Sequence, residues 1–283
     1  MEITATRAET QSLLTAESLR YAPHRVDEAR GELDLQLGRG LFLRFGGGES
    51  RFRLLDPDKQ GTVPFTQLDR DEQRLSAAAG YRLRSGLVVT FGYEESTTDF
   101  IAQRDRSNDG TAVIAGLAWE APRFSLHGSF ARREMESRAG STFGSFEGTT
   151  YRVQVGLGGR RSFSPVIYAQ RELAYTLDVT SSYALDERRG ISLGFPFGHR
   201  ATVTAFYETG ELEYHLATGE AGGRRDDLTA WGATAALPLR RSLRFQAGYR
   251  LVDYDSNLSG VSRRTRQIVI GIAFGTGSRG PWY

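Results

Sequence analysis

A two-residue alternation of apolar and polar side chains constrains the fold of this chain more than any other feature. In the segment 240–251, RRSLRFQAGYRL, every second side chain is apolar: Leu243, Phe245, Ala247, Tyr249 and Leu251. Arginine, glutamine and glycine fill the positions between them. Because successive side chains of an extended chain point to opposite faces, the segment predicts a strand with one apolar and one polar face.

The same pattern returns along the whole chain and predicts one all-β domain over residues 1–283. The predicted strands cover 2–20, 27–37, 41–55, 68–84, 87–103, 111–120, 123–136, 149–158, 165–177, 187–196, 200–215, 227–238, 242–255 and 264–275. No stretch resembles a linker, and no helical period persists beyond about two turns. Residues 1–25 are predicted to form either the first strand or an N-terminal plug or tail, and residues 276–283 a C-terminal tail.

The connections between these segments alternate in length. Tight turns are predicted at 38–40, 85–86, 121–122, 159–164, 196–199 and 239–241, and longer polar loops at 56–67, 105–110, 136–148, 217–225 and 255–262. Short turns at one end and long loops at the other are typical of a transmembrane antiparallel up-and-down β-barrel, with the turns on the periplasmic side. The sequence predicts about 14 strands (range 12–16), so both termini lie on the short-turn side.

Composition alone would also suit a soluble protein, since 39% of residues are hydrophobic and the mean hydropathy is −0.40. A membrane-spanning helix needs about 20 apolar residues in a row, and no run approaches that length. A spanning strand needs only about 9–11 residues with alternate ones apolar. A soluble all-β barrel or sandwich is the alternative, and extraction without detergent would favour it.

Charge and cysteine content narrow the choice of partners and compartment. Acidic and basic residues interleave around a net charge of +2, so no basic block predicts a nucleic-acid partner. The absence of cysteine is compatible with a reducing cytosol, and it also suits a chain that crosses an oxidising periplasm unfolded. The N-terminus lacks the basic start and apolar core of a secretory signal, which for a barrel predicts that the numbering begins at a mature chain with an added Met.

Aromatic side chains gather near the strand ends on the apolar side, where amphipathic rings sit in a membrane interface. The predicted periplasmic girdle consists of Trp119, Phe124, Phe195, Phe245 and Phe274, and the outer girdle of Tyr93, Tyr207 and Trp231. The general preference of aromatic residues for strands is the alternative explanation.

The opposite face of the strands is small, polar or charged. The predicted pore-lining residues are Arg44, Arg82, Arg84, Glu94, Arg123, Arg152, Arg244 and Arg250. A barrel of about fourteen strands is too wide for side chains to fill, which predicts water inside. The arginines concentrate in the periplasmic half, which favours anions; the alternative is an Arg/Glu network that only stiffens the wall.

Two segments match short motifs of functional sites, a hydrolase elbow and a calcium loop, but only in part. The segment Gly190–Gly194 fits G-x-S-x-G, but Ser192 lies within continuing alternation rather than in a strand–turn–helix elbow, so no catalytic residue and no enzyme is predicted. Asp56, Asp58 and Gln60 resemble the first ligands of a calcium loop, although Gln60 and Gln67 stand where acidic ligands are expected. A plain polar loop is the preferred interpretation, and no metal site or cofactor is predicted.

Taken together, the chain resembles a Gram-negative outer-membrane β-barrel of the porin-like channel class. Within the last predicted strand, the segment Gln267–Phe274 is similar to the C-terminal assembly signal of such barrels, although residues 275–283 follow it. The resemblance implies the bacterial outer membrane, contact with its lipid and lipopolysaccharide, and the barrel-assembly machinery as a partner. It implies passage of small polar or anionic solutes; the alternatives are a barrel subunit of an export or envelope complex with periplasmic partner proteins, and a structural or adhesive barrel with a blocked lumen.

Overall fold

The computed structural model describes residues 2–13, 21–54, 68–83, 86–138, 144–158, 163–176, 181–197, 201–216, 221–240 and 243–274. Fourteen antiparallel strands form one sheet in sequence order. They are β1 (Glu2–Leu13), β2 (Tyr21–Gln36), β3 (Leu41–Leu54), β4 (Arg70–Arg82), β5 (Leu87–Phe100), β6 (Asn108–Ala121), β7 (Phe124–Ser137), β8 (Phe146–Leu157), β9 (Ser164–Ala174), β10 (Ser181–Phe197), β11 (Ala201–Leu216), β12 (Ala221–Arg240), β13 (Leu243–Ser256) and β14 (Arg263–Phe274).

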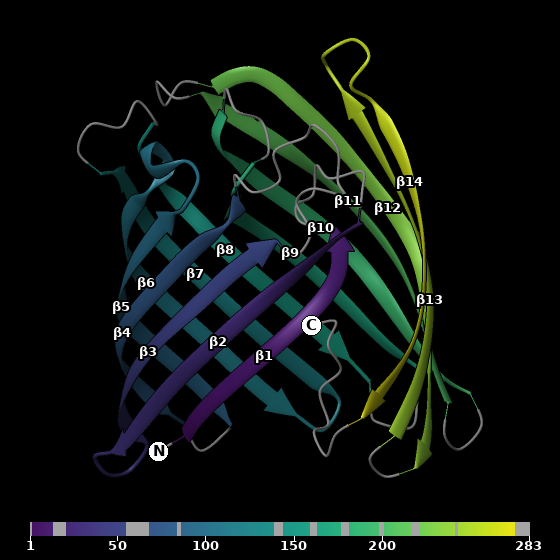
Figure 1. The fold of residues 1–283 in the computed structure, drawn as a ribbon. Helices are drawn as coiled ribbons and strands as arrows, with labels where there is room; N and C mark the ends of the chain where they lie inside the picture. The colour runs from purple at the N-terminus through teal and green to yellow at the C-terminus, as the bar shows by residue number, and fades with distance from the viewer. Residues whose placement is uncertain are drawn as a thin grey trace.

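The sheet curls around a central space, with the N-terminus on the short-turn side (Figure 1). The predicted fold class, all-β with about 14 up-and-down antiparallel strands, is confirmed. Residues 2–13 pair with β2 along their whole length, and β2 begins at Tyr21 rather than at residue 27. Among the described residues, no pairing joins β1 to β14. The predicted tail at 276–283 lies outside the described part.

The polarity of the outer face reverses along the strands. Nearer the short turns, the outward side chains are apolar and exposed, and Phe91 and Phe130 keep 64% and 53% of their surface. The register aligns Phe91, Ala115 and Phe130 across three neighbouring strands. We call this outward surface the apolar belt; it includes Leu41, Phe45, Leu75, Tyr81, Val89, Val113, Leu117, Leu157, Ile167, Ile191, Leu237, Ile268 and Ile270.

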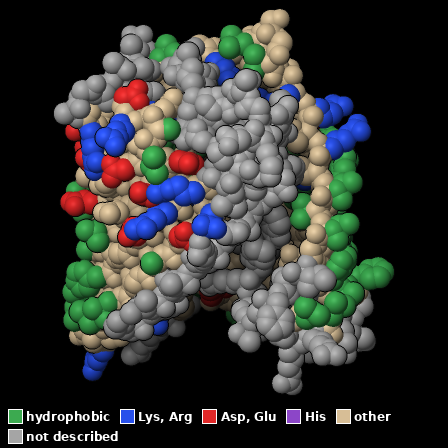
Figure 2. Space-filling view, viewed as in Figure 1, with side chains coloured by type: hydrophobic (Ala, Val, Ile, Leu, Met, Phe, Trp, Pro, Cys, Tyr) green, Lys and Arg blue, Asp and Glu red, His purple; other side chains and the backbone are tan. Residues whose placement is uncertain are grey.

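Nearer the long loops, the same outward positions become charged. Residues that continue the outward alternation there are Glu49, Arg51, Asp71, Glu95, Arg132, Glu147, Arg171, Glu187, Arg225, Asp227, Asp253 and Arg264. Figure 2 shows acidic and basic side chains gathered on the upper part of the visible face, above hydrophobic side chains at its lower left edge. We call this surface the charged band.

The inner face reverses in the opposite sense along β10–β13. Inward side chains at the long-loop end form a buried apolar cluster of Ala184, Leu212, Tyr214, Leu228, Ala230, Val252 and Tyr254. The inward residues that the sequence analysis identified are small, polar or charged, whereas this part of the inner wall is apolar. The outside is charged at this level, so apolar side chains are buried inward, as in a protein surrounded by water.

Near the short turns, an inward glycine makes room for a large ring. Phe42 on β3 is almost fully buried and pairs with Gly80 on β4. A Cβ atom at Gly80 would lie 2.2 Å from Cζ of that ring. Gly80 is therefore required by the close approach of Phe42 to the inner surface of the neighbouring strand.

Candidate functional site: the luminal cavity

Two of the predicted pore-lining arginines at the short-turn end, Arg44 and Arg82, have described side chains on neighbouring strands. Arg44 is held by Asp34 through two hydrogen bonds of 2.8 and 2.9 Å, and its Nε also lies 3.1 Å from a Glu32 carboxylate oxygen. Arg82 is exposed, and its backbone amide donates to the carbonyl of Gly40 in the β2–β3 turn. The positive charge of Arg44 is thus largely compensated.

The other three predicted pore-lining residues at the short-turn end are Arg123, Arg84 and Arg244. Arg123 is exposed in the tight turn between β6 and β7. Arg84 lies outside the described residues, and so does the side chain of Arg244, whose backbone pairs with Ala273 in β14.

The predicted residues nearer the long loops each pair with an opposite charge. These pairs are Arg133 with Glu94 at 3.1 Å, Arg152 with Glu172 at 2.7 Å, and Arg250 with Glu208 at 3.2 Å. The first two pairs lie on the β5–β9 wall and the third spans β11 and β13. These arginines lie on the inner wall, where a pore lining would be. They also form ion pairs with glutamates, which is the Arg/Glu network that the sequence analysis gave as its alternative.

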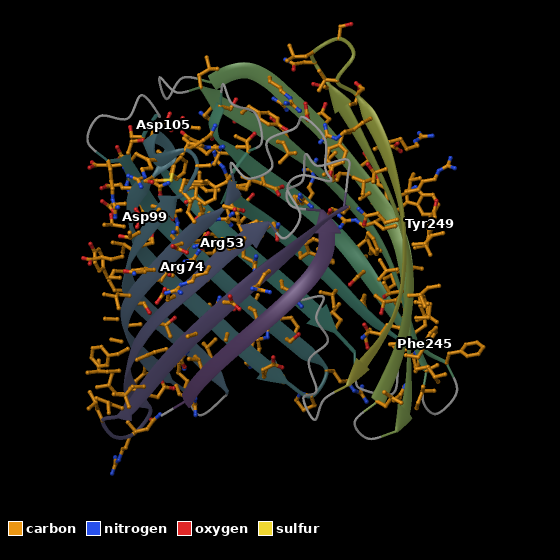
Figure 3. The ribbon with its side chains drawn as sticks, viewed as in Figure 1. Arg53, Arg74, Asp99, Asp105, Phe245 and Tyr249 are labelled. Carbon is orange, nitrogen blue, oxygen red and sulfur yellow. The ribbon has the colours of Figure 1, made fainter. Side chains whose placement is uncertain are left out.

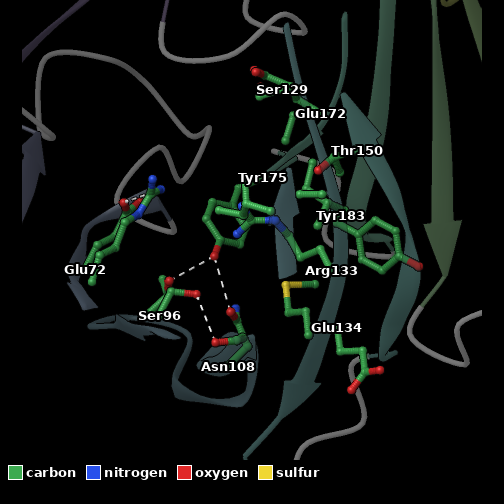
Figure 4. Close-up of a pocket in the computed structure, with 18 of the residues that line it drawn as sticks. Glu72, Ser96, Asn108, Ser129, Arg133, Glu134, Thr150, Glu172, Tyr175 and Tyr183 are labelled. Carbon is green, nitrogen blue, oxygen red and sulfur yellow. Dashed lines mark hydrogen bonds and ion pairs between the residues drawn. The ribbon is translucent and has the colours of Figure 1, made fainter. Parts of the chain in front are cut away.

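A cavity of about 410 Å³ opens inside the wall formed by β4 to β9. Tyr175, directly after β9, extends across it, and its hydroxyl oxygen lies 3.0 Å from Thr98 Oγ1 and 3.4 Å from Asn108 Oδ1, so it can donate to Asn108 while accepting from Thr98. In Figure 4, Tyr175 lies between Ser96 and Asn108 on one side and Thr150 and Glu172 on the other. The cavity is lined mainly by polar side chains: Glu72, Arg74, Ser96, Thr98, Asn108, Ser129, Arg133, Thr150, Arg152, Glu172 and Tyr175.

Beyond the cavity, two connections meet at the long-loop end. The 3-10 turn η3 (Arg104–Arg106) between β5 and β6 presents Arg106, which is only 3% exposed. Its guanidinium donates to the carbonyl of Thr176 at 2.8 Å and to that of Ser182 at 3.3 Å. The same guanidinium lies 5.2 Å from the ring centroid of Phe100. These contacts tie the β5–β6 connection to the β9–β10 connection, and we call them the outer latch.

The opposite wall, β10 to β14, carries a second set of buried charges. Asp226 is fully buried and accepts from Arg224 at 2.8 Å and from Arg263 at 3.3 Å. Both guanidinium groups lie over aromatic rings at 4.0 Å, Arg224 over Tyr214 and Arg263 over Tyr254. Separating a buried carboxylate from its two cations costs considerable free energy. This cluster therefore fixes the register of β11 to β14 rather than offering a free site.

The predicted girdle residues whose side chains are described project from the outer face. Tyr93, Tyr207 and Trp231 are exposed at the upper edge of the apolar belt, and Tyr207 pairs with Trp231. Figure 3 shows Phe245 and Tyr249 pointing away from the sheet at two heights of β13. Near the short turns, the Trp119 and Phe124 rings meet edge to face at 5.0 Å, and Phe195 lies beside Phe163. The side chain of Phe274 lies outside the described part.

Above the belt, the charged band contains ion pairs on its outer surface. Arg138, at the end of β7, donates to Asp109 at 2.9 Å and also contacts Asp99. The hydrogen bond from Arg138 lowers the pKa of the Asp109 carboxyl. Because these groups remain partly exposed, such pairs are compatible with an aqueous environment and contribute little to stability.

The sequence analysis missed several residues of the cavity and its cover. Arg74, Arg133 and Glu172 lie on the polar side of segments whose alternation was recognised, so extending the inward faces toward the long loops would have found them. Tyr175 falls inside the predicted strand 165–177, but β9 ends at Ala174, and Arg106 lies in a connection where no periodicity indicates direction. The hydrogen bonds from Tyr175 to Thr98 and from Arg106 to Thr176 join residues 77 and 70 positions apart.

The described residues contain neither a metal-binding cluster nor a hydrolase elbow around Ser192. No group of three or more His, Cys, Asp or Glu side chains there could hold a metal ion. The calcium candidates Asp56, Asp58 and Gln60 lie outside the described residues. Ser192 lies within β10, which continues to Phe197. Within the same described ranges, no helix is long and apolar enough to cross a membrane.

Comparisons with known proteins find similar solved structures but no similar sequence. No family model matches the sequence, and no curated protein sequence matches it. Among solved structures, the chain is similar to the copper transporter OprC, with a TM-score of 0.48 and 11% sequence identity over 87% of this chain. The match covers 49% of the OprC chain, so this chain spans about half the length of that protein.

Proposed function

We propose that this chain is a bacterial outer-membrane β-barrel whose lumen passes small polar solutes. The observation that carries the proposal is the reversal of polarity on the outer face, from the exposed apolar belt to the charged band. A soluble barrel would expose polar groups along the whole length of its strands. A barrel embedded in a lipid bilayer needs an apolar outer surface only where it contacts lipid, and its interior can remain polar.

The dimensions of the belt agree with this environment. On β13 the outward apolar residues run from Leu243 to Leu251. At about 3.4 Å per residue, this stretch measures roughly 27 Å along the strand, or roughly 20 Å along the normal at a tilt of about 40°. The outer membrane is thinner than average, and the outward band of known barrels is about 25 Å tall.

The polar inner wall at the level of the belt supports a conduit rather than a filled core. Arg44 and its partner Asp34 lie there together with Arg82 and small residues such as Ser76 and Gly46. Because Arg44 is compensated, we expect only a modest preference for anions. Among the described side chains near the short turns, Arg82 is an exposed cation on the inner face that can produce that preference.

Single-channel recording in a planar bilayer tests the proposal. Folded protein should give discrete conductance steps, with a reversal potential in a salt gradient slightly on the anion side. Replacing Arg82→Gln should reduce the anion preference, whereas Arg44→Gln should leave Asp34 uncompensated and shift selectivity toward cations. The outer-face variant Arg132→Gln serves as the control, and absence of conductance from folded protein would contradict the channel.

A blocked structural or adhesive barrel is the second candidate, because the outer latch and the apolar cluster of β10–β13 fill parts of the long-loop end. Such a protein would stay silent in the bilayer even when the latch is removed. A subunit of an export or envelope complex would instead conduct only with its partners present. Co-purification from native membranes, followed by recording with and without the co-purified proteins, distinguishes the two.

A further inference from the structure

The cavity inside β4 to β9 has a chemistry that points to a class of solute. We propose that it binds a small hydroxylated monocarboxylate, of about the size of a hexonic acid, on its way through the barrel. This inference deepens the proposed function and rests on it. The volume of about 410 Å³ lies within the range of small-molecule sites, and its polar lining disfavours an apolar ligand.

One cationic side chain in the cavity is incompletely paired. Among the described carboxylates, that of Glu72 contacts Arg74, with its Oε2 3.6 Å from Nη2 of Arg74. Glu72 already accepts a 2.6 Å hydrogen bond from Nε of Arg70 through its other oxygen. The Arg74 side chain is 56% exposed, so its guanidinium can donate to a ligand carboxylate in the bidentate geometry that these groups favour.

Three inward carboxylates of the same wall are held by arginines: Glu72 by Arg70 at 2.6 Å, Glu94 by Arg133 at 3.1 Å, and Glu172 by Arg152 at 2.7 Å. Glu134 also borders the cavity, but it alternates with the inward Arg133 and so lies on the outward side of β7. Among the described inward side chains at this level, Arg70, Arg74, Arg133 and Arg152 exceed Glu72, Glu94 and Glu172 by one. This excess favours a ligand with one negative charge over a metal ion or a dication.

Hydroxyl groups complete the lining and provide partners for hydroxyls on the ligand. Ser129 and Thr150 lie on the neighbouring strands β7 and β8, and Ser129 pairs in register with Arg152. Ser96 lines the opposite side on β5. Hydroxyls donate and accept, so they suit a ligand with several hydroxyls better than a bare aliphatic acid.

Isothermal titration of the full chain in detergent micelles separates these contributions. D-gluconate carries both features, D-gluconamide keeps the hydroxyls without the charge, and propionate keeps the charge without the hydroxyls. Gluconate should bind at least about tenfold more tightly than either of the others, as expected for loss of a charged hydrogen bond or of several neutral ones. Arg74→Gln should weaken gluconate binding about tenfold and leave gluconamide binding unchanged.

Two matched variants keep the test decisive. Arg132→Gln removes an arginine that pairs with Glu147 on the outer face, and should leave gluconate binding unchanged. Arg74→Lys should restore part of the affinity if charge is what the ligand recognises. Equal binding of gluconate and gluconamide, no binding of gluconate to folded protein, or an unaltered affinity in Arg74→Gln would overturn the inference.

Bilayer recording of the same preparations separates this inference from the proposed function. Conductance without gluconate binding overturns the cavity site and leaves the channel standing. Gluconate binding that depends on Arg74, without conductance under any condition, supports the site and contradicts the channel.

Discussion

Placing an arginine on the apolar belt should destabilise the protein far more than placing one on the inner wall of the same strand. Ala115 and Ala118 both lie on β6, and their side chains point to opposite faces. Ala115 lies between Phe91 and Phe130 in the register, near the middle of the belt. Ala118 faces inward, on the same side as Glu120.

The expected magnitudes follow from these surroundings. An arginine facing lipid near the midplane costs about 2–4 kcal/mol, and this is the loss expected for Ala115→Arg. For Ala118→Arg the new side chain enters the polar interior within reach of Glu120, so we expect a loss of less than about 1 kcal/mol. Ala115→Leu, an apolar change at the lipid-facing position, should be close to neutral.

Urea titration of the protein refolded in phospholipid vesicles measures the free energy of unfolding for all four chains. The linear dependence on urea gives each value, and unchanged slopes show that the variants unfold in the same way. Similar losses for Ala115→Arg and Ala118→Arg would refute the assignment of the outer face to lipid.

Two further substitutions test other parts of the structure. Arg106→Ala should raise single-channel conductance by opening the outer latch, whereas the exposed Arg104→Ala of the same turn should not; equal conductance of the two variants would contradict the latch. Gly80→Ala should cost about 1–3 kcal/mol in the urea titration, because its methyl group would overlap the Phe42 ring. Gly128→Ala has open space and should cost under about 1 kcal/mol; a Gly80→Ala loss no larger than this would contradict the packing.

The sequence was sufficient for the strand order and for most strand boundaries, because two-residue alternation reports directly on a sheet with two unlike faces. It was insufficient where the alternation is interrupted. The beginning of β2 contains Pro23 and His24, and the beginning of β12 contains Gly222 and Gly223, so both strands start about six residues before their predicted positions.

The change of environment along the strands was also present in the sequence but was not recognised. Leu212 and Tyr214 alternate with Glu211 and Glu213 in the opposite phase to Val203 and Tyr207. If the strand is assumed to keep the same apolar face along its whole length, these residues interrupt the alternation. On the proposed location in a membrane, with lipid around the lower part of the strands and water around the upper part, they mark the level at which the outer surface leaves the lipid.

The site itself was only partly predictable. The inward positions of Glu94 and Arg152 follow from alternation, but their pairing with Arg133 and Glu172 depends on which neighbouring strand faces them. The contact between Arg106 and the β9–β10 connection depends on the curvature of the whole sheet. Local pattern carries no information about such long-range contacts.

The most direct test of the central claim is a spin-label scan of β5 in phospholipid vesicles. The chain has no cysteine, so single cysteines can be introduced and labelled one at a time from position 87 to position 99. At outward positions, we expect collisions with dissolved oxygen to dominate at Val89 and Phe91, and collisions with a water-soluble nickel complex to dominate at Glu95 and Asp99. A change-over between Tyr93 and Glu95 supports a barrel that leaves the membrane at that level, whereas uniform access of the nickel complex along the outward face would contradict it.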